Sequence, residues 1–130
     1  MKKISFFERF FSRIGKSKYT KENLKAAEES IKTLKFQMDL LNQKAFNLAE
    51  NYPEQKKQIS ECFNQVNSIV PSASVRAGKF EQAISVAITK VSTSCDKIFT
   101  SKNKDRLDAE IKSLAKAIRE RINADEPVSE

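Results

Sequence analysis

Apolar residues recur every seven positions along the first half of the chain. Two such series run together, the second three residues behind the first, and neither misses a position over four repeats. They consist of Leu24, Ile31, Met38 and Ala45, and of Ala27, Leu34, Leu41 and Leu48. This spacing places all of these side chains on one face of an α-helix, as in the seam of a coiled coil. The pattern therefore predicts a long helix with one face buried against other helices.

The ends of this first helix follow from its flanking residues. Thr20 can accept hydrogen bonds from the first free backbone N–H groups, and Pro53 disfavours helical geometry in the residue before it. We therefore expect the helix over residues 21–50. Phe36 and Leu40 form a second apolar strip beside the seam, which predicts that the middle of the helix is buried on more than one side. Such burial favours a helical bundle over a lone two-stranded coil.

Similar stripes predict three further helices. Pro53 suits the first position of a helix, where a missing N–H costs nothing, and this second helix should end near Val70. The stretch "VPSAS" combines Pro71 with two serines that can cap, so we expect a third helix over residues 74–99 and, after polar turn residues, a last helix to about Asn123. The expected buried faces are Ile59, Cys62, Phe63, Val66, Ile69 and Val70; Phe80, Ile84, Ala87, Ile88, Val91, Cys95 and Ile98; and Leu107, Ile111, Leu114, Ile118 and Ile122.

Turn-forming residues are scarce, which limits the chain to a few long elements. It has two Gly and three Pro in 130 residues, against roughly nine and six at average usage. The prediction is an all-α domain over residues 19–124, folded as an antiparallel up-down four-helix bundle. If Pro71 only kinks the chain, residues 53–99 form one helix and the domain becomes a kinked three-helix bundle. Residues 125–130 form an acidic tail with too little apolar content to stay ordered.

Residues 1–18 differ in character from the rest of the chain. They contain six basic residues and one acidic residue, a net charge of +5 out of +7 for the whole sequence. At 100° per residue, the apolar side chains of "ISFFERFFSRI" (residues 4–14) fall within an arc of about 160°, with polar residues opposite. The sequence thus predicts an N-terminal amphipathic helical arm. Its expected binding residues are Ile4, Phe6, Phe7, Arg9, Phe10, Phe11, Arg13 and Ile14.

We interpret this arm as a membrane anchor. Its phenyl rings would enter the headgroup boundary while its basic residues face anionic lipid, and "GKSKYT" (residues 15–20) is a hinge that lets the arm point away from the bundle. In pattern, the arm resembles the short amphipathic membrane-targeting helices of bacterial cell-division proteins, over about one tenth of the chain. Two alternatives stay open. The arm packs on the bundle as an extra core helix that Gly15 ends, or it fills a groove on a protein partner.

The residues that most catalytic and metal sites need are missing. The chain has no histidine, and its two cysteines, Cys62 and Cys95, do not form a CxxC pair. Gly15 and Gly78 cannot build a glycine-rich phosphate loop. Hydroxyls adjoin the thiol in the run of residues 92–95, but without a base we expect them to bond back to the helix or cap it. We predict no enzymatic activity, no cofactor and no metal, and reduced core thiols.

The last predicted helix carries basic residues that could meet nucleic-acid phosphates. Lys112, Lys116 and Arg119 share one face. Acidic residues on the same helix reduce its positive electrostatic potential, and no nucleic-acid-binding motif is visible. This favours ion pairs within a solvent-exposed helix surface instead. The acidic residues are Asp105, Asp108, Glu110 and Glu120. We therefore do not expect a nucleic-acid partner.

Location and function follow from these patterns together. Charges interrupt the opening apolar stretch, so it is not a signal peptide, and no run approaches the roughly 18 apolar residues that span a bilayer. We expect a cytoplasmic, non-catalytic adaptor or regulatory protein, a monomer or weak homodimer, held at the inner membrane face by its arm. The alternative is a soluble bundle that assembles with itself or a protein partner through the seam of its first helix, with the arm packed as core. The sequence does not identify the protein partner under either interpretation.

Overall fold

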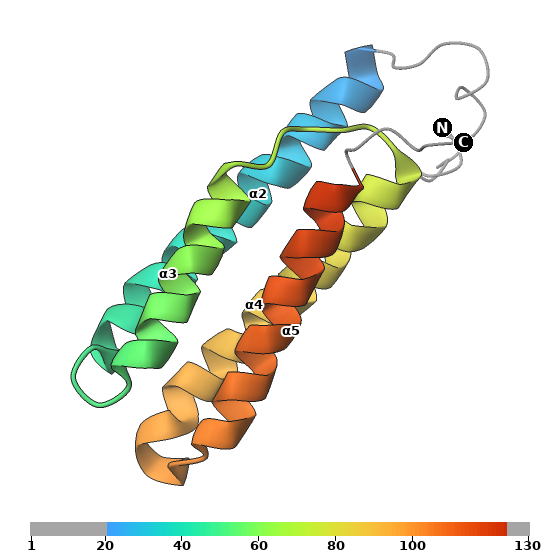
Figure 1. The fold of residues 1–130 in the computed structure, drawn as a ribbon. Helices are drawn as coiled ribbons and strands as arrows, with labels where there is room; N and C mark the ends of the chain where they lie inside the picture. The colour runs from blue at the N-terminus through green and yellow to red at the C-terminus, as the bar shows by residue number, and fades with distance from the viewer. Residues whose placement is uncertain (1–20, 125–130) are drawn as a thin grey trace, which may run out of the picture.

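Four α-helices form the part of the protein that the computed structural model describes, residues 21–124 (Figure 1). They are α2 (Lys21–Ala45), α3 (Pro53–Asn67), α4 (Val75–Ser101) and α5 (Lys104–Asn123), and a short 3₁₀ helix, η1 (Phe46–Leu48), extends α2. Within these residues there is no β-strand. The prediction of an all-α fold with four packed helices is confirmed. The expected arm (residues 1–18) and acidic tail (residues 125–130) lie outside the described residues.

Local sequence signals set the helix boundaries. Pro53 occupies the first turn of α3. The hydroxyl of Ser74 accepts a hydrogen bond from the backbone N–H of Ala77 at 3.0 Å and caps α4, and the side chain of Asn103 caps α5 in the same way. Lys102 ends α4 in the left-handed region, at φ 57°. Residues 68–74, which include Pro71, are not helical, so Pro71 lies in a break and the three-helix alternative is excluded.

The helices pack as two hairpins. α2 lies against α3, and α4 against α5; between the hairpins, α2 contacts α4, and α3 contacts α5. Figure 1 shows consecutive helices running in opposite directions, so the contacts between the hairpins join helices that run the same way. The connection between α3 and α4 crosses one end of the bundle, because these two helices are not close neighbours. The contact between α4 and α5 is the most extensive and that between α3 and α5 the least.

The core contains the predicted seam of the first helix. Seven of its eight side chains are buried in α2 and η1, and six of these pack with the stripes of the other three helices. Leu24 is the exception, since 39% of it is exposed. The prediction that it is buried is wrong because the first turns of α2 extend past the crossing connection (Figure 1), where no other helix is alongside. The next seam residue, Ala27, packs on Ala73 of that connection.

Three other apolar residues are exposed against expectation. Phe36 and Leu40 are 61% and 49% exposed, so the prediction that the middle of the first helix is buried on more than one side is wrong. Both neighbours of α2 lie on its seam side, which leaves the opposite face to solvent. Val70, 64% exposed, lies beyond the end of α3 at Asn67. α2 ends at Ala45 and α3 at Asn67, whereas the predicted ends were about residue 50 and near Val70.

Candidate functional site

The residues predicted from the sequence to bind a membrane or partner all precede the described helices. Ile4, Phe6, Phe7, Arg9, Phe10, Phe11, Arg13 and Ile14 fall within residues 1–20, outside the part of the chain that the structure describes. The structure therefore does not test their role. It does describe the surfaces of the bundle to which the arm is joined.

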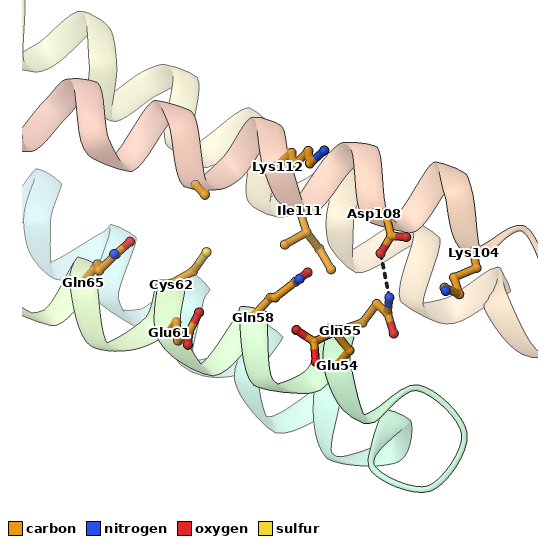
Figure 2. Close-up of a pocket in the computed structure, with 11 residues that line it drawn as sticks. Glu54, Gln55, Gln58, Glu61, Cys62, Gln65, Lys104, Asp108, Ile111 and Lys112 are labelled. Carbon is orange, nitrogen blue, oxygen red and sulfur yellow. Dashed lines mark hydrogen bonds between the residues drawn. The ribbon is translucent and has the colours of Figure 1, made fainter.

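A groove runs between α3 and α5, the pair of helices with the least extensive contact (Figure 2). It encloses about 470 Å³. Its floor consists of Cys62 and Ile111, which are buried, and Ala115, which is half-buried. Figure 2 shows Gln58 of α3 and Ile111 of α5 extending into the space between the helices. The groove thus has a small apolar floor between polar walls.

The two walls carry different charge. The α3 wall presents, in chain order, Glu54, Gln58, Glu61 and Gln65. Steps of three and four residues keep these side chains on one helix face. The α5 wall presents Lys104 and Lys112, again at helical spacing. We call these the acidic rim (Glu54, Gln58, Glu61, Gln65) and the basic rim (Lys104, Lys112).

One hydrogen bond crosses the groove and sets how the helices align. The side-chain amide of Gln55, which is buried, donates to Oδ1 of Asp108 at 2.6 Å (Figure 2). A bond to a charged acceptor is stronger than one between neutral groups. Asp108 is therefore held by α3. A hydrogen bond from a neutral amide does not cancel the charge of the carboxylate, so the α5 wall carries two basic residues and one acidic residue between them.

Neither thiol is activated. Cys62 and Cys95 are free and buried. Burial, reinforced by the neighbouring Glu61 carboxylate, raises the pKa of Cys62 to about 11. Burial also raises the pKa of Cys95 to about 11, with Lys44 opposing the rise and Asp96 adding to it. Because the thiolate is the reactive form, both groups are poor nucleophiles near neutral pH. The expectation of reduced thiols in the core agrees with their positions.

A buried ion pair lies near the crossing connection and was missed by the sequence reading. Nε of Arg121 on α5 donates to Oε2 of Glu81 on α4 at 2.7 Å, and the two side chains are 0% and 5% exposed. Nη2 of Arg121 also donates to the carbonyl of Val70 at 2.8 Å, and Ser30 of α2 donates to Oε1 of Glu81 at 2.6 Å. This cluster joins three helices and the connection. The sequence did contain a signal for it: each charged residue continues an apolar stripe, three positions from Ile84 and from Ile118 respectively.

The hydroxyls of residues 92–94 have structural partners. Thr93 bonds back to the carbonyl of Thr89, which confirms the expectation for that residue. Ser92 instead accepts a hydrogen bond from Lys44 of α2 at 2.7 Å, and Ser94 donates to the Glu110 carboxylate of α5. The run therefore helps to hold α4 against its two neighbours.

The basic face of α5 is exposed. Lys112, Lys116 and Arg119 all point to solvent. Arg106 forms an ion pair with Glu110 one turn on, at 3.3 Å, as expected for pairing within the helix. Between residues 21 and 124, no group of three or more His, Cys, Asp or Glu side chains is arranged to hold a metal ion. In the same stretch, no helix has both the length and the apolar content to cross a bilayer.

Comparison with known proteins adds no relative to this picture. No protein-family model matches the chain, and neither a curated protein nor a solved structure is similar enough to count as a match.

Proposed function

We propose that this protein is a non-catalytic adaptor or regulatory protein, tethered reversibly to the cytoplasmic membrane face by its N-terminal amphipathic helical arm. In this proposal the helices α2–α5 act as an antiparallel up-down four-helix bundle that carries the binding surfaces. The observation that carries the proposal is the composition of residues 4–14, where one helical face would be apolar and the flanking positions basic.

The described core supports this division of roles. Its main cluster contains apolar residues from α2, η1, α3, α4 and α5, so the four helices cover one another's buried stripes. The seam of α2 is used inside the chain, with Leu34, Met38 and Leu41 no more than 3% exposed. This burial argues against assembly through that seam, the route considered from the sequence alone.

The energies favour a reversible tether. Full burial of a phenyl ring contributes about 1.5–3 kcal/mol, and each Lys or Arg near an anionic surface adds about 1 kcal/mol. Ordering the arm opposes these terms at about 1–2 kcal/mol per residue. The sum is small, so binding should depend on both the rings and the charges.

Sedimentation with anionic liposomes tests the proposal. Phe7→Ser with Phe11→Ser should weaken binding at every salt concentration, because burial of phenyl area does not depend on counterions. Arg9→Gln with Arg13→Gln should weaken binding chiefly at low salt, because exposed charges are screened within about 8–10 Å at 0.1–0.15 M ionic strength. Phe36→Ser with Leu40→Ser removes exposed apolar residues from α2 instead and should leave binding unchanged.

A melting experiment separates the tether from an arm packed as core. Deleting residues 1–16 should abolish liposome binding while the melting temperature stays nearly constant. Equal binding by the intact and shortened chains would refute the tether. A melting temperature lowered by more than about 10 °C, a change of roughly 2–3 kcal/mol in a domain of this size, would assign the arm to the core.

A further inference from the structure

The groove between α3 and α5 has one acidic and one basic wall, which makes its face complementary to itself. We infer that this face binds a second copy of the same chain, in a two-fold symmetric dimer whose axis is parallel to the helices. The inference rests on the arrangement of the acidic and basic rims across the groove. It does not depend on the arm.

The alignment of α3 and α5 sets the height of each charge along the groove. Gln55 bonds Asp108, 53 positions later in the chain, and Figure 2 shows these two side chains directly across from each other. Because both helices run the same way, Glu61 is level with Leu114, and Glu54 with Leu107. Lys112 comes two residues before Leu114, and Lys104 three residues before Leu107. At about 1.5 Å per residue, Lys112 therefore lies about 3 Å from the level of Glu61, and Lys104 about 4.5 Å from that of Glu54, both offset towards the N-terminal end of α5. A flexible lysine side chain spans such a step.

Symmetry then determines which charges meet. A two-fold axis parallel to the helices places α3 of one copy over α5 of the other and leaves every residue at its own height. Glu61 therefore faces Lys112 of the second copy, and Glu54 faces Lys104. A two-fold axis across the helices would instead place α3 on α3, with like charges opposed. Complementary charge favours the parallel dimer, because juxtaposed like charges are unfavourable at an interface.

The size of the face makes this dimer a weak one. α3 has 15 residues, a length of about 22 Å, and two adjacent helices are about 20 Å wide with their side chains. Such a face buries roughly 450 Å² per copy, or about 900 Å² in total, below the 1,200 Å² of standard stable interfaces. We therefore expect a dimer that forms at high protein concentration and low salt, in line with the expected monomer or weak homodimer.

The symmetry has a consequence for the tether, which rests on the proposed function. With the axis parallel to the helices, α2 begins at the same end of the bundle in both copies, so both arms can reach one membrane surface. Two linked anchors bind more tightly than one. A dimer axis across the helices would send the arms to opposite ends.

Sedimentation velocity on the full chain at low salt, without lipid, tests the inference. Glu61→Lys and Lys112→Glu each turn two attractive contacts of the dimer into repulsive ones, so each variant alone should raise the dissociation constant by about tenfold or more, taking roughly two- to fivefold for each exposed pair lost. A 1:1 mixture of the two variants restores opposite charges at both contacts. The mixture should therefore dimerise as the wild type does.

The same experiment includes control variants, and three of its outcomes would overturn the inference. Glu29→Lys reverses an exposed charge on α2, away from the groove, and should leave the dissociation constant unchanged. Glu61→Gln and Lys112→Gln, which keep side-chain size, should each weaken the dimer less than the reversals do. A wild-type chain that stays monomeric at the highest concentration would overturn the inference. The inference would also be overturned if Glu61→Lys and Lys112→Glu each dimerised like the wild type, or if the mixture of these two variants stayed monomeric. None of these outcomes decides whether a single arm binds liposomes, so a failure of the dimer would leave the proposed tether standing.

Discussion

Replacing Arg121 by Met should destabilise the bundle more than any other single charge removal on α5. Arg121 is 0% exposed and gives one hydrogen bond to the Glu81 carboxylate and another to the Val70 carbonyl. Met fills much of the same space but cannot donate a hydrogen bond. Glu81 would keep its bond from Ser30 but would be left as a buried charge without its cation.

The magnitude follows from the burial of both partners. Removing one member of a buried ion pair costs about 3–5 kcal/mol, because the other charge is left uncompensated. With a urea m value of about 1.5 kcal/mol/M, this loss lowers the unfolding midpoint by about 2–3 M. A domain has a total stability of only about 5–15 kcal/mol, so the variant should be close to unfolding at 37 °C.

Urea unfolding followed by circular dichroism measures this effect. Arg119→Met, on the exposed side of the same helix, is the matched control and should change stability by no more than about 0.5 kcal/mol. The double variant Glu81→Met with Arg121→Met removes both charges and should recover most of the loss, because a well-packed apolar pair often replaces a buried ion pair at little cost. If Arg121→Met costs no more than Arg119→Met, the buried pair does not hold these helices together and the reasoning fails.

Two further predictions concern the core. Leu34→Asp should lower the free energy of unfolding by several kcal/mol in thermal or urea unfolding, because it puts a charge at a site that is 3% exposed. Phe36→Asp, at a site 61% exposed on the same helix, should change it by no more than about 0.5 kcal/mol. Similar losses in both variants would contradict the orientation of α2. Cys62 and Cys95, with pKa values raised to about 11, should react slowly with a thiol-specific disulfide reagent at pH 8 in the native protein and rapidly in urea. Because the folded pKa lies above the unfolded value of about 8.5, the thiols contribute stability that is fully present below about pH 8.5 and is lost as the pH rises towards 11. Fast reaction of the native thiols at pH 8 would show that they are accessible.

Features that depend on near neighbours in the chain were predicted well. The seven-residue repeat identified the buried face of α2, and Pro71 with its serines marked the break between α3 and α4. Periodicity and proline stereochemistry act over a few residues, so the sequence carries them directly. The amphipathic pattern of residues 4–14 is also local, but these residues lie outside the described part of the chain, and their role as a tether stays a prediction.

Features that depend on which helices become neighbours could not be predicted. The strip of Phe36 and Leu40 has helical spacing, but only the fold decides that α3 and α4 both lie on the other side of α2. The groove and its two rims arise in the same way, since α3 and α5 meet only because the connection between the hairpins crosses the bundle end.

The buried charges show this division most clearly. The sequence alone places Glu81 and Arg121 on the apolar stripes of α4 and α5, where a lone charge would be too costly to bury. Only the tertiary structure brings the two residues, 40 positions apart, within 2.7 Å of each other. Secondary structure and apolar faces were therefore determined by local sequence, because they arise from interactions between residues close in the chain. Helix neighbours, the groove and the ion pair were decided by the tertiary structure, because their stability depends on groups that only packing brings together.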